Sequence, residues 1–212
     1  MRGLPVLTLY YTPLTCALAS HIALEDAGAE YVARRVDFKN AEQQSPDYLA
    51  VNPKGRVPAL ATPRGILTET PAILAFIAQS FPVARLAPLD DPFAFAQAQS
   101  FASYLGSTVH TNHAHRPRGY RWADEPSSLE DMKRKTTANM AACFELIETK
   151  MFKGPWAMGD DYSFIDPYLF TLGGWLQGDG VDIARFPRVA EHSARMAERA
   201  SVKKALAEEV AV

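Results

Sequence analysis

The sequence has few of the features that would assign a function at once. Its only cysteines, Cys16 and Cys143, do not have the C-x-x-C spacing of a dithiol redox pair. No run of about eighteen apolar residues could span a membrane, and a formal net charge of −2 offers no basic surface for nucleic acid. Cys143 lies in an apolar helical pattern, and we interpret it as core. We therefore expect a protein of the reducing cytoplasm, with no nucleic acid or membrane as partner.

The stretch 8–28 changes from strand to helix within a few residues and leaves Cys16 at the turn. Its first four residues are β-branched, aliphatic or aromatic, which suits a strand, and Pro13 ends that strand. The apolar residues after Cys16 have helical spacing, and Gly28 suits the end of the helix. A thiol at a helix N-terminus meets unpaired N–H groups and the positive end of the helix dipole, and both favour the thiolate. Cys16 is therefore a candidate nucleophile, the alternative being a small buried hydrophobic residue.

The element pattern divides the chain in two. Strand and helix signals up to about residue 80 give the order β-α-β-β-α, in which the first two strands should be parallel and the last two an antiparallel hairpin. A proline-rich linker follows, and after it only helical spacing is found. We predict an α/β domain over 1–82, a linker over 83–91 and an all-α domain over 92–212. The expected strands are 6–11, 31–36, 57–60 and 66–68, and the expected helices are 16–27, 46–50, 70–80, 93–110, 129–151, 163–175 and 187–199.

Ser163-Phe-Ile-Asp166 has the form of a capping box at the start of the 163–175 helix. We interpret it as purely structural.

Two further features accompany Cys16. Val57 precedes a proline at the start of a strand, and a cis bond there would turn the Val57 N–H and C=O toward Cys16, where an extended peptide could pair with them. At the start of the next helix, Glu69 can hold an ammonium, while N–H groups and the Thr70 hydroxyl can hold a carboxylate. Together these groups suit the α-amino acid end of a short peptide.

A short peptide with a central thiol and a free amino acid head describes glutathione, and the chain resembles the cytosolic glutathione S-transferases, in particular the bacterial beta class. The resemblance rests on the stretches 9–21, 51–60, 67–70 and 162–168, in that order, and on a β-α-β-β-α half before a helical half. It implies a thioredoxin-like glutathione-binding domain and a helical bundle domain that carries the electrophile pocket. It also implies a homodimer that uses glutathione as co-substrate in detoxification.

The resemblance assigns roles to individual residues. Cys16 would lie beside the glutathione sulfur, Val57 would be a backbone clamp, and Glu69 with Thr70 would hold the γ-glutamyl end. Ser103, Ser107 and His110 would complete the glutathione site, with Cys16 and His110 as the catalytic residues. The electrophile pocket would comprise Tyr11, His110, Tyr120 and Trp122.

Two departures from the beta-class pattern remove polar groups near the sulfur. Ala17 stands where these enzymes commonly have serine, and Thr111 where they often have lysine.

The motif His110-Thr-Asn-His113-Ala-His115 could suggest a metal site. On one helix the first two histidines share a face, whereas the third points well away, and no partner cluster of His, Cys or Glu is evident. We therefore expect no metal, with His110 in the cleft and the other two structural or at a pocket wall.

Three activities fit these residues. The favoured one is conjugation of the glutathione thiol to small hydrophobic electrophiles. The alternatives are glutathione-dependent thiol–disulfide exchange through Cys16, and non-catalytic binding of glutathione or an apolar ligand, since fold alone does not imply activity.

Overall fold

The computed structural model describes residues 7–210, so the predicted strand start at Val6 lies just outside it. The N-terminal half has the β-α-β-β-α order that the sequence predicts, with the short helix α2 inserted before the third strand. That third strand begins at Ala59, two residues later than predicted. The elements are β1 (Leu7–Tyr11), α1 (Ala17–Asp26), β2 (Tyr31–Arg35), α2 (Pro46–Val51), β3 (Ala59–Thr62), β4 (Gly65–Thr68) and α3 (Thr70–Ser80).

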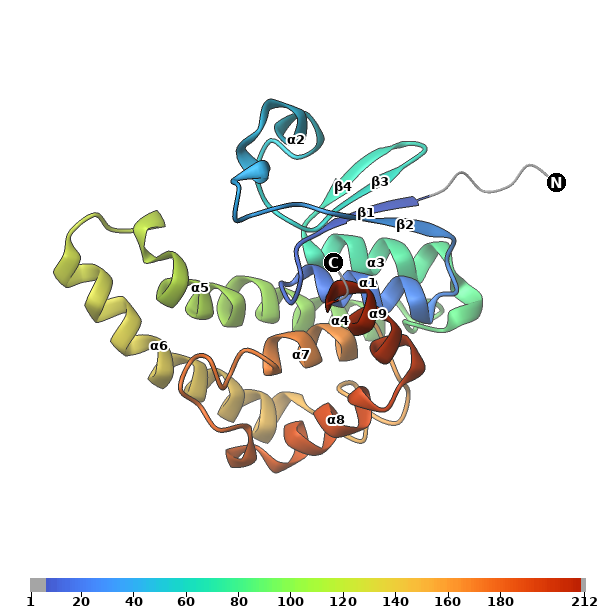
Figure 1. Cartoon of the computed structure of the whole chain (residues 1–212). Coiled ribbons are helices and arrows are strands. Elements are labelled where there is room, and N and C mark those ends of the chain that lie inside the picture. Colours follow the sequence, from blue (N-terminus) through green and yellow to red (C-terminus); the bar gives the residue numbers. More distant parts are fainter. Residues whose placement is uncertain (1–6, 211–212) are drawn as a thin grey trace. The chain divides into compact units, whose positions relative to one another are not determined.

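The four strands form one mixed sheet in the order β2-β1-β3-β4. The first two are parallel and β3 runs antiparallel to β4, which confirms the two predicted pairings. Strand β3 also runs antiparallel to β1, a pairing that was not predicted. Leu9 pairs with Leu60 at the centre of the sheet, and both side chains are fully buried. Helices α1 and α3 cover one face (Figure 1). Burial of each such leucine stabilises the fold by about 1.5–3 kcal/mol.

The second half is helical, and within residues 7–210 no strand follows β4. The helix predicted over 93–110 does not end at His110, because a wide π-helical turn at Leu105–Val109 joins α4 to α5 without a break. A similar turn at Ile147–Met151 extends α6. The last helix, α9, was not predicted. The helices are α4 (Pro92–Tyr104), α5 (His110–Arg118), α6 (Pro126–Leu146), α7 (Ile165–Gly173), α8 (Pro187–Ala197) and α9 (Ala200–Val210).

The described residues group into two compact units, one formed by 7–92 with 197–210 and the other by Phe93–Met196. Helix α9 therefore belongs with the α/β half, although the sequence pattern assigns everything from 92 to 212 to the helical domain. Polar contacts hold it there. Arg199 Nη2 lies 2.6 Å from Asp26 Oδ1, and Lys204 Nζ lies 2.8 Å from each carboxylate oxygen of Glu25.

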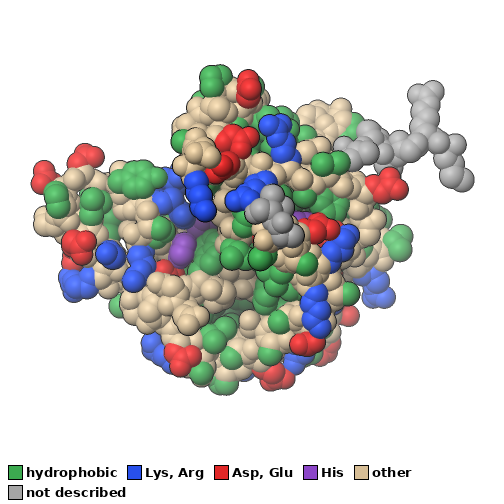
Figure 2. Space-filling model, in the orientation of Figure 1, with side chains coloured by type: hydrophobic (Ala, Val, Ile, Leu, Met, Phe, Trp, Pro, Cys, Tyr) green, Lys and Arg blue, Asp and Glu red, His purple; other side chains and the backbone are tan. Residues whose placement is uncertain are grey.

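None of the helices in the described part of the chain combines the length and the apolar character needed to cross a membrane. On the face drawn in Figure 2, acidic and basic side chains are interspersed.

One half of the predicted capping box at the start of α7 is present, the bond from the Ser163 N–H to the Asp166 carboxylate, whereas the Ser163 hydroxyl accepts from the Ile165 N–H and not from that of Asp166. The Ser163 N–H and hydroxyl donate to Asp166 Oδ2 at 2.7 and 3.2 Å. The other oxygen, Oδ1, accepts from the Ala157 N–H at 2.7 Å and lies 2.9 Å from His192 Nε2. Because Asp166 and His192 are fully buried, this carboxylate ties the start of α7 to a preceding turn and to α8.

Replacement of Asp166 by alanine should strongly destabilise the protein, because it leaves a buried N–H and a buried imidazole without their acceptor. We expect a loss of about 3–5 kcal/mol in the free energy of unfolding, measured by urea denaturation. Asp182 provides the control, since its exposed side chain accepts only from the Ala184 N–H among the contacts described. Asp182→Ala should cost about 1 kcal/mol, and equal losses in the two variants would contradict this account.

Candidate functional site

Cys16 lies immediately before α1, as predicted, and is almost fully buried. Its thiol donates to the Val57 carbonyl oxygen across an Sγ–O distance of 3.4 Å. The preceding loop is fixed by hydroxyl groups: Thr15 Oγ1 donates to the Thr12 carbonyl at 2.7 Å and accepts from the Ala17 N–H at 3.3 Å. Thr15 thus caps the first turn of α1. The Cys16 thiol points to Val57, in the loop before β3.

The loop before β3 places the Val57 carbonyl beside the Cys16 thiol, and the Val57-Pro58 bond is cis. Two donors converge on the preceding carbonyl, that of Arg56: Asn52 Nδ2 at 2.6 Å and the Tyr48 hydroxyl at 2.7 Å. The Asn52 side chain also accepts from the Lys54 N–H at 3.1 Å. Asn52 and Tyr48 are buried, so the loop is anchored from within.

Gly55 lets this loop make its turn. Its φ is +60°, and a Cβ at that position would lie 2.7 Å from Gln44 Nε2. A larger residue would therefore meet both backbone strain and a close contact.

A charged pair lies at the start of α3. Glu69 has a φ of +73° and directly precedes the helix, whose first residue is the buried Thr70. Lys54 Nζ lies 2.5 Å from Glu69 Oε1 and 2.9 Å from Thr68 Oγ1. Glu69, predicted to hold the ammonium of a peptide ligand, pairs here with the ammonium of Lys54. Lys54 was not among the predicted site residues, although it lies in the Asn-Pro-Lys-Gly stretch just before Val57.

Tyr11 lies inside the N-terminal unit. Its side chain is buried, and its ring centroid is 5.5 Å from that of His21. Burial raises its pKa, and the negative charge of Glu209 raises it further.

In the helical unit, Ser103 and Ser107 are exposed one turn apart, and the Ser107 hydroxyl donates to the Ser103 carbonyl at 2.8 Å. His110 follows on α5. Its ring meets Trp175 edge to face at 5.0 Å, and its Nε2 lies 3.3 Å from Arg118 Nη2. Trp175 was missed as a functional candidate because nothing in its local sequence marks it.

Two histidines of the His-rich motif, His110 and His113, contact the same tryptophan, and the third contacts another. His113 stacks on Trp175, and its Nδ1 lies 2.8 Å from Asp179 Oδ2. The His115 ring meets Trp122 at 4.5 Å between centroids. Trp122 and Tyr120, the predicted pocket aromatics, are respectively 47% and 64% exposed.

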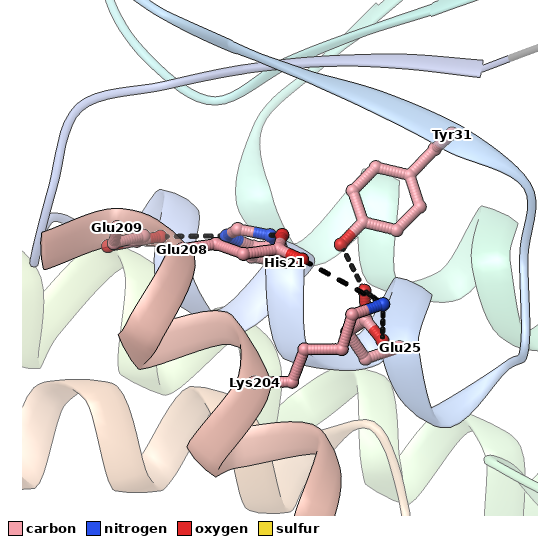
Figure 3. Close-up of polar contacts among 6 residues, drawn as sticks. All are labelled: His21, Glu25, Tyr31, Lys204, Glu208 and Glu209. Carbon is pink, nitrogen blue, oxygen red and sulfur yellow. Dashed lines mark hydrogen bonds and ion pairs between the residues drawn. The ribbon is translucent and has the colours of Figure 1, made fainter. Parts of the chain in front are cut away.

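A cluster of potential metal ligands occurs elsewhere, in the N-terminal unit (Figure 3). Ligand atoms of His21, Glu25 and Glu208 lie within 4.8 Å of one another. The Lys204 ammonium contacts both oxygens of Glu25 and lies 3.8 Å from Glu208 Oε1. The Lys204 ammonium therefore provides a positive charge for this cluster from within the protein.

A thioredoxin-like domain joined to a helical domain is the architecture of the known proteins that this chain resembles. Residues 5–79 match the glutathione S-transferase N-terminal domain family. The chain is 30% identical to glutathione S-transferase GstA of Escherichia coli O157:H7, over 95% of this chain and 98% of that protein.

Solved structures agree. A glutathione transferase homologue from Sulfitobacter with bound glutathione is 50% identical, with a TM-score of 0.91 and coverage of 94% and 96% of the two chains. The beta-class glutathione S-transferase of Sphingomonas chungbukensis is 33% identical, with a TM-score of 0.84 and coverage of 97% and 100%. The chain belongs to the glutathione S-transferase family.

The Val57 loop leads to a pH-dependent prediction. Burial raises the pKa of Tyr48 to about 12, whereas an unfolded tyrosine titrates near pH 10. The protonated phenol therefore favours folding below about pH 10, and this contribution is lost as the pH rises from about 10 toward 12. We expect the urea-derived free energy of unfolding to fall over this range in the wild type and to fall less in Tyr48→Phe.

At neutral pH, Tyr48→Phe should cost only about 1 kcal/mol, because Asn52 still donates to the Arg56 carbonyl. Tyr120→Phe, at an exposed position, is the control and should retain the wild-type pH slope. A wild-type slope in Tyr48→Phe as well would contradict the prediction.

Proposed function

We propose that this protein is a glutathione transferase, which joins the thiol of glutathione to small hydrophobic electrophiles. The observation that carries the proposal is the contact between the Cys16 thiol and the Val57 backbone in a chain of this family. A backbone group in the loop before β3 can pair with an extended tripeptide, whose own thiol then lies near Cys16 Sγ. We further propose that it acts in the cytoplasm, as a homodimer, in detoxification.

The groups in the N-terminal unit match the ends of glutathione. The Val57 peptide would pair with the cysteinyl backbone. Glu69 would bind the γ-glutamyl ammonium, and the N-terminus of α3 at Thr70 would bind its carboxylate. Lys54 already lies beside Glu69, and its ammonium would provide a partner for a substrate carboxylate.

In the helical unit, Ser103, Ser107 and His110 would complete the glutathione site, with His110 and Cys16 as the catalytic residues. Tyr11, Tyr120, Trp122 and His110 would form the electrophile pocket. The glutathione thiol gives up its proton and its sulfur forms a bond to the electrophilic carbon. In a substitution the leaving group departs with its bonding electrons, and in an addition the opened double bond takes up a proton.

Positioning contributes more to such a reaction than ionisation of the thiol. A thiol with a pKa of about 8.5 is roughly 3% ionised at pH 7, and a pKa about two units lower raises this fraction about 25-fold. The same change lowers the reactivity of each thiolate about 6- to 10-fold. Only a few-fold gain remains, so contact between the sulfur and a bound electrophile must supply most of the acceleration.

Isothermal titration with glutathione, followed by a conjugation assay with a chlorinated nitroaromatic, tests the proposal. We expect binding and turnover. Glu69→Gln should raise the dissociation constant for glutathione about 3- to 10-fold, because the amide oxygen can still accept from the ammonium but has lost the charge that makes this hydrogen bond about twice as strong. Glu191→Gln removes an exposed carboxylate of α8 that pairs with Arg195, and it should leave binding unchanged.

The other outcomes separate the alternatives. Glutathione binding without conjugation, but with disulfide exchange that Cys16→Ser abolishes, would identify an oxidoreductase. Binding with neither activity would identify a ligand-binding protein. Absence of glutathione binding would refute the transferase and the oxidoreductase and leave only binding of an apolar ligand.

The electrophile pocket leads to a separate prediction. Trp122→Ala should change the preferred electrophile, because it removes a large, half-exposed aromatic surface, and should leave glutathione affinity nearly unchanged. The measurement is kcat/KM over a panel of aromatic and aliphatic electrophiles. Leu146→Ala, at an exposed position of α6, is the control. An unchanged substrate profile in Trp122→Ala would remove this residue from the pocket.

A further inference from the structure

A single carboxylate holds the chain on both sides of Cys16. Glu209 lies on α9 and is 1% exposed. Its Oε2 accepts from the Leu14 N–H at 2.7 Å, two residues before Cys16, and its Oε1 lies 3.1 Å from His21 Nδ1, five residues after it. The contact with His21 is drawn in Figure 3.

The Leu14 contact fixes an unusual piece of backbone. Leu14 has a φ of +57°, a left-handed conformation that a residue with a branched side chain rarely adopts, and its side chain is exposed. Its side chain therefore contributes little to holding this conformation. The charged acceptor on α9 makes a strong hydrogen bond to the backbone at this point.

The His21 contact fixes the other side. His21 is fully buried, and its Nε2 lies 3.1 Å from Glu208 Oε2. A neutral imidazole donates from one nitrogen only, whereas the imidazolium donates to both carboxylates. The other groups facing this ring are Tyr11 on β1 and Tyr31 on β2, at 5.5 and 5.7 Å between centroids. Glu25 of α1, which also contacts Lys204, completes the charged surroundings.

We propose that Glu209 is a positioning residue for Cys16: through the Leu14 N–H, the C-terminal helix sets where the thiol lies relative to the Val57 carbonyl. The role in catalysis rests on the proposed function. The effect on the thiol does not, because it depends only on the geometry of the loop before α1.

The test measures the alkylation rate of Cys16 with iodoacetamide, by peptide mapping that distinguishes it from Cys143, and in parallel the affinity for glutathione. In Glu209→Ala, Leu14 loses its acceptor. We expect the Cys16 rate to change on the order of tenfold, which lies below the roughly hundredfold effect of a 1 Å misplacement at a reacting centre.

Two variants separate positioning from general stability. In Glu209→Gln the amide oxygen can still accept from Leu14, and its NH2 can donate to a neutral His21, so the Cys16 rate should stay within about twofold of the wild type. Glu208→Gln alters the same histidine without touching Leu14, and it should also leave the rate within about twofold.

Glu209→Asp covers the case in which Glu209→Ala does not fold. Its carboxylate is one methylene shorter and cannot reach both partners in place, so the Cys16 rate should change by at least about threefold. All rates are compared well below the thermal midpoint of each variant.

Three results would overturn the proposal. The first is a Cys16 rate that is unchanged in both Glu209→Asp and any folded Glu209→Ala. The second is an equal change in Glu208→Gln, which would place the effect in His21 or in docking of α9. The third is an equal change in Glu209→Gln, which would show that charge and not the Leu14 hydrogen bond matters. If the Cys16 rate changes as expected but the wild-type protein neither binds nor turns over glutathione, the positioning stands and the proposed function fails.

Discussion

The convergence of two buried donors on the Arg56 carbonyl is the constraint on which the rest of the N-terminal unit depends. Asn52 and Tyr48 hold that carbonyl, and the next residue presents its own carbonyl to the Cys16 thiol. The sheet fixes the other side of this arrangement, because β3 pairs with β1 in a register that sets Leu60 opposite Leu9. Cys16 follows β1 and Val57 precedes β3, so antiparallel pairing brings the two segments to the same end of the sheet.

The sequence predicts those features whose cause is local. Strand and helix order follow from short-range pattern, and the bond from the Ser163 N–H to Asp166 follows from a spacing of three residues. The glutathione-site residues Cys16, Val57, Glu69 and Thr70 lie in motifs that span a few positions each. Their expected roles come from resemblance to a family and remain proposals. Lys54 could have been found, since a lysine in the same loop as Val57 is the nearest cation in sequence to Glu69.

Features whose partners lie far away in the sequence were not predictable. Helix α9 shows why, because its buried face includes the carboxylate of Glu209, which interrupts the apolar spacing by which helices are recognised. His21, the partner of Glu209, is 188 residues away in the sequence, and no local pattern links these two residues. Trp175 was missed for the same reason, since its contacts with His110 and His113 depend on how the helices pack.

The Cys16 contact indicates how a ligand would lie in the site. The Val57 carbonyl can accept a hydrogen bond from the Cys16 thiol but offers nothing to a thiolate. A peptide that pairs with the Val57 backbone would use this carbonyl as its own acceptor. A carbonyl oxygen has two lone pairs, and the Arg56 carbonyl accepts from two donors, so the Val57 carbonyl can accept from the peptide and from the Cys16 thiol together. The bound peptide backbone and Sγ would therefore lie at the same carbonyl oxygen, so the position of that oxygen fixes how close the two sulfurs come.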